Sequence, residues 1–216
     1  MAFEAYDDLE QGERVRQWLR SNAAAILAGL VIAVVIIIGM AQWRRHQQAN
    51  ASQASRVYEQ LVEARQAGQG AAAQVYGAAL SQHYAGSAYA VFGALQLAQE
   101  QASAKQYDPA MTQLRWAGAH SKDDAIKPLI GIRIAQLLLA QGKADEALSQ
   151  LKGLDAPAWA GRSEELRGDA LVKLGRTEEA RKAYQASLAA LDPEVPQRNV
   201  IQMKLDDLAS AGKQGA

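Results

Sequence analysis

An apolar run near the N-terminus, Ala23–Trp43, constrains this chain more than any other feature of its sequence. At about 1.5 Å per residue, an α-helix over this run spans roughly 30 Å, the thickness of a bilayer core. Its only strongly polar residue, Gln42, lies at the end. A helix that is apolar on every side must be buried all round. The run therefore predicts a transmembrane helix over residues 23–43.

The flanks of the run separate an anchor from a cleaved signal peptide. A signal peptide has a short basic start and a small-x-small exit. Here the exit reads "QWRRHQ", and Trp18 and Trp43 lie near the two ends, where indole rings favour the membrane interface. The preceding segment is acidic, with Glu4, Asp7, Asp8, Glu10 and Glu13. These features favour a retained single-pass anchor, and a cleaved signal peptide is the alternative.

Charge sets the expected orientation. Three arginines precede the run and two follow it, which slightly favours a cytoplasmic N-terminus; they are Arg14, Arg16 and Arg20, then Arg44 and Arg45. The chain has no cysteine, which suits an oxidising compartment. We expect residues 1–22 to be a cytoplasmic tail and the C-terminal domain to lie outside the cytoplasm.

The composition of the remaining chain favours an all-α domain without affinity for nucleic acid. Lys and Arg number 23, as do Asp and Glu, so no net charge attracts a polyanion. Alanine is abundant and phenylalanine is rare, which favours close-packed helices. No run of alternating apolar and polar residues is long enough to predict a strand.

Two stretches repeat each other, "IRIAQLLLAQGKADEALSQL" and "ELRGDALVKLGRTEEARKAY". Gly142 matches Gly175 and Ala147 matches Ala180, each pair 33 residues apart. This period is close to that of the tetratricopeptide repeat, a pair of helices joined by a turn. The glycines end the first helices, where a left-handed residue is needed. The alanines lie where two helices cross closely.

Weaker copies place the small crossing residue at Ala72 and Ala110. The predicted fold is an all-α, tetratricopeptide-like solenoid behind one transmembrane helix. Its segments are a stalk and first soluble helix over 44–66, repeats over 67–193 and a C-terminal capping helix and tail over 194–216. Trp116 and Trp159 are expected to pack between neighbouring repeats.

No residue pattern indicates catalysis, a metal or a cofactor. His46, His83 and His120 lack partners at metal-ligand spacing, and no nucleophile elbow or phosphate-binding loop occurs. We expect a protein that is not an enzyme and has no catalytic, metal or cofactor residues. A hydrolase or metal protein within the helical array is the remaining alternative.

A stack of helix pairs offers a concave surface to extended peptides or partner helices. The repeat register predicts which residues of the last two pairs line this protein-binding surface. They are Leu129, Ile132, Gln136 and Leu139, followed by Arg162, Glu165, Asp169 and Lys173. Mixed charge beside apolar positions suits unfolded or partner protein.

The chain also resembles a known family. The tail "EQGERVRQWLRSNAAAILAG", the span, "WRRHQ" and the final "QMKLDDLA" are similar to the YfgM family, the tetratricopeptide-like ancillary subunit of the SecYEG translocon. The resemblance implies an inner-membrane anchor with a periplasmic domain. It also implies three partners: SecYEG, a membrane-anchored periplasmic chaperone of the peptidyl-prolyl isomerase type, and newly exported polypeptides. An anchored scaffold for another envelope assembly machine is the alternative function.

Overall fold

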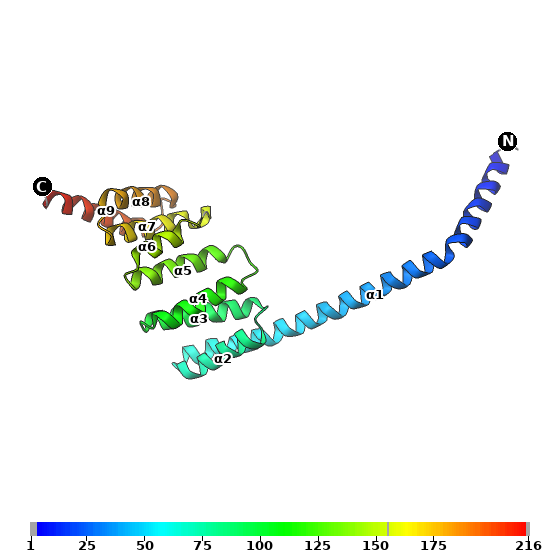
Figure 1. Ribbon diagram of the computed structural model, residues 1–216, viewed down its shortest axis with the longest axis horizontal. Coiled ribbons are helices and arrows are strands. Elements are labelled where there is room, and N and C mark those ends of the chain that lie inside the picture. The colour runs from blue at the N-terminus through cyan, green and yellow to red at the C-terminus, as the bar shows by residue number, and fades with distance from the viewer. Residues whose placement is uncertain (1–3, 155, 215–216) are drawn as a thin grey trace. The chain divides into compact units, whose positions relative to one another are not determined.

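The computed structural model describes residues 4–154 and 156–214, and these residues form helices joined by short turns. The α-helices are α1 (Glu4–Gln66), α2 (Gly70–His83), α3 (Ala88–Ser103), α4 (Tyr107–His120), α5 (Lys127–Ala140), α6 (Ala144–Leu151), α7 (Ala160–Lys173), α8 (Thr177–Ala190) and α9 (Gln197–Gln214) (Figure 1). A short 3₁₀ helix, η1 (Pro157–Trp159), precedes α7. The predicted all-α fold is confirmed.

The chain divides into two units, residues 1–52 and 53–216. In the first unit, the apolar side chains of α1 are exposed; Ile37, for example, is 65% exposed. Within the described residues, this stretch of α1 is long enough and apolar enough to cross a membrane. The observation fits a single-pass membrane protein.

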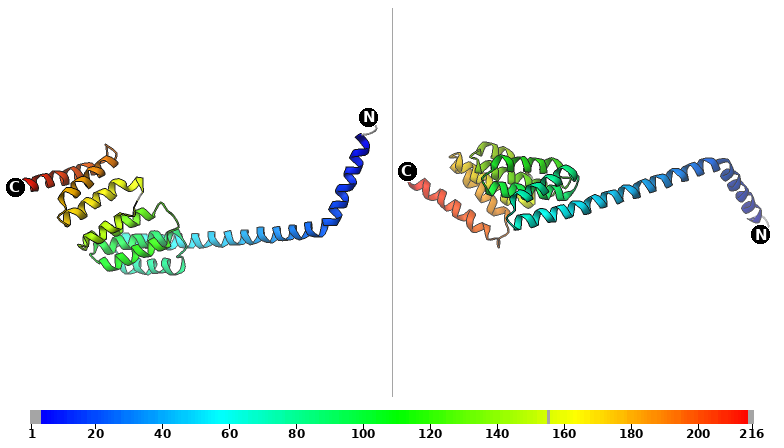
Figure 2. Two further views of the ribbon diagram at one scale, coloured as in Figure 1. Left: turned by 45° about the horizontal axis from the view of Figure 1, so that its top comes forward. Right: turned by 90° about the horizontal axis from the view of Figure 1, so that it is seen from below.

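The second unit is built from four helix pairs. The end of α1 pairs with α2, and the later pairs are α3–α4, α5–α6 and α7–α8. Figure 1 shows α2 to α8 stacked in chain order, and the colours in the left view of Figure 2 follow the same order. Each pair turns at a residue with a left-handed backbone, whose φ is +69°, +59°, +78° and +72° at Gly68, Lys105, Gly142 and Gly175.

These four turns share one hydrogen-bond pattern. The N–H of the residue after the left-handed one donates to the carbonyl five residues earlier, as from Lys143 to Leu138 at 2.9 Å. The left-handed residue itself donates three residues back, as from Gly142 to Leu139 at 3.1 Å. The pattern satisfies carbonyls that a helix end leaves free. Gly142 and Gly175 therefore end the first helices, as their spacing predicted.

The small crossing residue of each second helix lies five positions after the left-handed residue. Ala73, Ala110, Ala147 and Ala180 hold these positions, and each is fully buried. The prediction of Ala72 was wrong by one residue, since Ala72 is only half-buried. With Ala73 in place, successive crossings are 37, 37 and 33 residues apart.

A small residue of α7 packs against a large residue of α8. In the last pair, a Cβ added at Gly168 would lie 2.3 Å from Cε1 of Tyr184. In the first pair the glycine lies on the second helix. A Cβ added at Gly77 of α2 would lie nearest to Leu97 of α3, and 3.5 Å from Cδ1 of Leu61, which is fully buried on α1.

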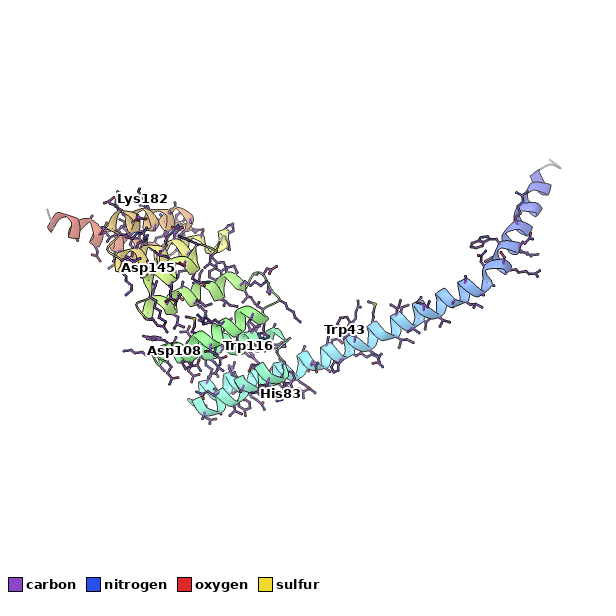
Figure 3. All side chains as sticks on the ribbon, in the orientation of Figure 1. Trp43, His83, Asp108, Trp116, Asp145 and Lys182 are labelled. Atoms are coloured by element: carbon purple, nitrogen blue, oxygen red, sulfur yellow. The ribbon has the colours of Figure 1, made fainter. Side chains whose placement is uncertain are left out.

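Both predicted packing tryptophans contact the core. Trp116 of α4 packs against two clusters of buried side chains, one around Leu61 and one around Leu114, and it stacks on His120 with ring centroids 4.2 Å apart (Figure 3). Trp159 packs against the second of these clusters. The tryptophans therefore join neighbouring repeats.

Helix α9 covers the end of the stack. Ile201 is fully buried, and Leu205 and Leu208 pack with it against Leu188 and Leu191. The opposite side of α9 is polar apart from Val200 and Met203, which are 50% and 66% exposed. The helix thus lies against α8 as a capping helix, the role that its sequence predicted.

Candidate protein-binding surface

The side of the array that carries the first helices of the pairs, namely the end of α1, then α3, α5 and α7, is here called the groove face; α5 contacts α7 directly. The third pair contributes α5. Leu129 and Gln136 are half-buried on it, whereas Ile132 and Leu139 are buried in the core at 3% and 7% exposed. Of the predicted residues on α5, Leu129 and Gln136 therefore retain exposed surface.

The fourth pair contributes α7, and α9 engages its predicted residues. Lys204 of α9 donates to Oε1 of Glu165 at 2.9 Å and to Oδ1 of Asp169 at 2.7 Å. Arg162 donates to Oε2 of Glu165 at 2.6 Å, and Gln197 of α9 donates to the same oxygen at 2.6 Å. These groups form a polar network between α7 and α9 that we call the α9 network.

The α9 network favours the charged forms of Glu165 and Lys204. Burial raises the pKa of Glu165, but the hydrogen bond from Lys204 and the charge of Arg162 outweigh it, so the pKa lies below its ordinary value. Burial alone would lower the pKa of Lys204. Its hydrogen bonds to Asp169 and Glu165 outweigh burial, so the pKa of Lys204 lies above its ordinary value. Burial and the 2.8 Å hydrogen bond to Asp169 raise the pKa of Tyr184.

The predicted groove residues therefore separate into two groups. Glu165 is 3% exposed and Asp169 is half-buried, and both are already bonded within the chain. Lys173, at the end of α7, is exposed. A binding role for these residues stays a prediction. The predicted residues that keep exposed surface outside the α9 network are therefore Leu129, Gln136 and Lys173.

A cleft of about 220 Å³ opens on the groove face between α3 and α5. Its walls are mostly small or apolar, and its charged or amide side chains are Gln99, Arg133 and Gln136. Arg133 donates to Oε1 of Gln99 at 3.1 Å. The remaining residues that line the cleft are Ala98, Ala102, Tyr107, Leu114, Leu137 and Ala140.

A larger cleft, about 880 Å³, lies on another face, between α6 and α8 over α7. Asp145 and Lys182 belong to its two walls (Figure 3). It exists because α6 has only eight residues, whereas α4 and α8 have 14 each. Ion pairs line it, Arg167 with Glu164 at 2.8 Å and Arg176 with Glu179 at 2.6 Å.

Within the described part of the chain, no group of three or more His, Cys, Asp or Glu side chains is arranged to hold a metal ion. His46 bonds Asn50 at 3.2 Å, and His120 bonds the carbonyl of Trp116 at 2.9 Å.

A family model of the tetratricopeptide repeat-like domain matches residues 16–210. The chain belongs to this family. The match covers the apolar part of α1, all four helix pairs and most of α9. It confirms the repeat architecture that the 33-residue spacing predicted.

Relatives within this tetratricopeptide repeat-like family align over almost the whole chain. The ancillary SecYEG translocon subunit of Escherichia coli K12 is 29% identical over 203 residues, 93% of this chain and 96% of its own. That of Neisseria gonorrhoeae is 26% identical over 205 residues, 94% of this chain and 97% of its own. The resemblance drawn from the tail, the span and the C-terminal helix is confirmed.

A solved structure shares the fold. Residues 41 to the end of MamA from Desulfovibrio magneticus RS-1 align with a TM-score of 0.54 at 19% identity. The alignment covers 76% of this chain and 90% of that one. At this identity, the likeness concerns the repeat architecture.

The sequence did not reveal Arg133 or the α9 network. Arg133 precedes the recognised glycine motif by nine residues, and its partner Gln99 lies 34 positions away in a weaker repeat. A signal for Lys204 did exist. It is a cation on the core-facing side of a predicted capping helix, opposite a repeat that carries two carboxylates.

Proposed function

We propose that this protein is a membrane-anchored ancillary subunit of the SecYEG translocon, with a non-catalytic, protein-binding repeat domain. One observation carries the proposal: relatives of that name align from the N-terminal tail through the C-terminal helix, over 93% of this chain. The aligned region includes the apolar stretch of α1 as well as the repeats. An alignment that depended on the shared repeats alone would extend only over the second unit, residues 53–216.

The anchor supports this role because it would hold the repeat domain beside a membrane channel. We place the N-terminus in the cytoplasm and the repeat domain in the periplasm. In that location the groove face would meet polypeptides as they leave the translocon. A membrane-anchored chaperone of the peptidyl-prolyl isomerase type would then receive them.

The accessible surface supports a binding rather than a catalytic function. The groove face of the first three pairs carries Leu129 and Gln136, together with the cleft between α3 and α5. Phe92 of α3 is 37% exposed, and its ring lies 6.4 Å from that of Tyr58. Apolar and amide side chains of this kind suit contact with polypeptide.

Topology is the first part of the proposal to test. The chain has no cysteine, so one cysteine at Gln214 (Q214C) reports the location of the repeat domain without interference. A membrane-impermeant maleimide should label Q214C in intact spheroplasts. The matched variant D7C should be labelled only after lysis. Labelling of Q214C only after lysis would overturn the periplasmic placement.

Association is the second part. A photo-crosslinking residue in place of Leu129, on the groove face, is compared with one in place of Val75, which is 66% exposed on α2. We expect SecYEG and an isomerase-type chaperone to co-purify with the full-length protein, and exported chains to crosslink at Leu129 more than at Val75. Co-purification with another envelope machine in place of SecYEG would favour the alternative scaffold function.

A further inference from the structure

The cleft between α3 and α5 has the chemistry of a specific subsite. Its volume, about 220 Å³, lies below the roughly 300–1,000 Å³ of small-molecule pockets. Ala98, Ala102 and Ala140 leave room between the two helices, and Leu114 and Leu137 line it with apolar surface. A space of this size and polarity suits an apolar side chain of a bound polypeptide rather than a cofactor.

Arg133 gives the cleft a positive charge that its surroundings do not neutralise. Across the described residues, no carboxylate lies within 4.0 Å of its guanidinium, and its hydrogen bond goes to the neutral amide of Gln99. The fourth pair differs, because Arg162 and Lys204 there are matched by Glu165 and Asp169. A carboxylate at Arg133 would gain a charge-assisted hydrogen bond, which is stronger than the one to Gln99.

Two amides complete the arrangement. Gln136 also lines the cleft, half-buried, and its side chain makes no hydrogen bond within the described part of the chain. An amide side chain offers both a donor and an acceptor, as does each residue of an extended backbone. Gln99 and Gln136 can therefore hold a peptide backbone whatever its sequence.

We propose that this cleft, the Arg133 subsite, binds an extended polypeptide segment in which an apolar side chain is followed by an acidic one. The apolar side chain fills the space between α3 and α5, and its neighbour's carboxylate pairs with Arg133. Gln99 and Gln136 bond the backbone between them. The inference deepens the proposed function, on which it rests, by naming the chemistry of the bound segments.

The test measures peptide binding to the full-length protein in nanodiscs by fluorescence anisotropy. Four labelled peptides share a Gly/Ser background. Three have blocked ends and carry Phe-Glu, Phe-Gln or Ser-Glu at the centre, and the fourth carries Phe-Gln with a free C-terminal carboxylate. We expect the Phe-Glu peptide to bind about tenfold more tightly than the other three.

Two variants locate the site independently. R133Q should remove the preference for Phe-Glu over Phe-Gln, whereas A140F, made at an exposed position on the rim, should fill the cleft and weaken both. The control R115Q removes an exposed arginine of α4 outside the cleft and should leave binding unchanged. Circular dichroism checks whether each variant keeps its helix content.

Three results would overturn the inference: equal binding of Phe-Glu and Phe-Gln, an unchanged preference in R133Q, or tightest binding of the peptide with the free terminus. The last would show capture of a chain end. Self-association of the protein would also overturn the inference if it accounted for the change in peptide anisotropy. Sedimentation measurements detect such self-association. Co-purification with SecYEG is measured separately, so failure of the subsite and failure of the proposed function give different results.

Discussion

The Nζ atom of Lys204 lies 2.7 Å from Oδ1 of Asp169, so a cation near the end of the chain is bonded to a carboxylate 35 residues earlier. The same ammonium group reaches Glu165, which is 3% exposed. Helix α9 is thus attached to α7 by charge as well as to α8 by apolar contact.

Replacing Lys204 by methionine should destabilise the end of the array by about 2 kcal/mol, because removing one partner leaves a buried carboxylate underbonded. Urea unfolding of the full-length protein measures the loss. The control K182M removes an exposed lysine of α8 and should change stability by less than about 0.5 kcal/mol. Equal effects of the two substitutions would argue against the α9 network as a stabilising contact.

The α9 network should also make the stability of the protein depend on pH in acidic solution. The pKa of Glu165 lies below its ordinary value of 4.5 in the folded protein. Its contribution is therefore complete above pH 4.5 and is lost as the pH falls below that value through the folded pKa. Thermal unfolding between pH 6 and pH 3 should show a smaller loss of stability in E165Q than in the unmodified protein. Parallel curves would contradict the role assigned to Glu165.

Lys105 occupies a left-handed position that three of the four hairpin turns give to glycine. With φ at +59°, a side chain there costs energy that glycine avoids. K105G should raise the free energy of unfolding by about 0.5–1 kcal/mol, and G142A should lower it by about 1 kcal/mol. K143G, at the neighbouring residue with φ of −87°, is the control and should be destabilising.

Gly168 lies against an anchored ring. An added Cβ would come within 2.3 Å of Tyr184, whose hydroxyl is fixed by its 2.8 Å bond to Asp169, so the ring cannot turn aside freely. G168A should cost about 2 kcal/mol. Calorimetry measures the stability of G168A and of the control G153A. An added Cβ at Gly153 meets nothing within 4 Å, so the stability of G153A should be nearly unchanged.

The last two pairs could be predicted from the sequence because local signals agreed there. Gly142 and Ala147 repeat as Gly175 and Ala180, and acidic residues begin both second helices. The turn of the second pair could not be recognised in the sequence, because Lys105 occupies the position that is glycine in the other pairs. The register of the first pair was not recognised because its glycine, Gly77, lies on the second helix, where it packs against Leu97 of the next pair as well as against Leu61.

The candidate surface could be predicted only in part, because burial there depends on contacts distant in sequence. The repeat register identified Gln136 and Glu165, which do lie on first helices. It could not show that Lys204 would reach Glu165 across 39 residues. Nor could it pair Arg133 with Gln99, since that contact depends on how two successive pairs stack.

The eight-residue length of α6 has a consequence for how the array opens. Local stability follows the amount of packed neighbouring structure. The second helix of the third pair ends at Leu151, and the cleft beside α8 leaves it flanked by solvent. Its amide protons should therefore exchange with deuterium before those of α4 and α8. The repeat domain would then begin to unfold at the third helix pair, while the pairs on either side of it remain folded.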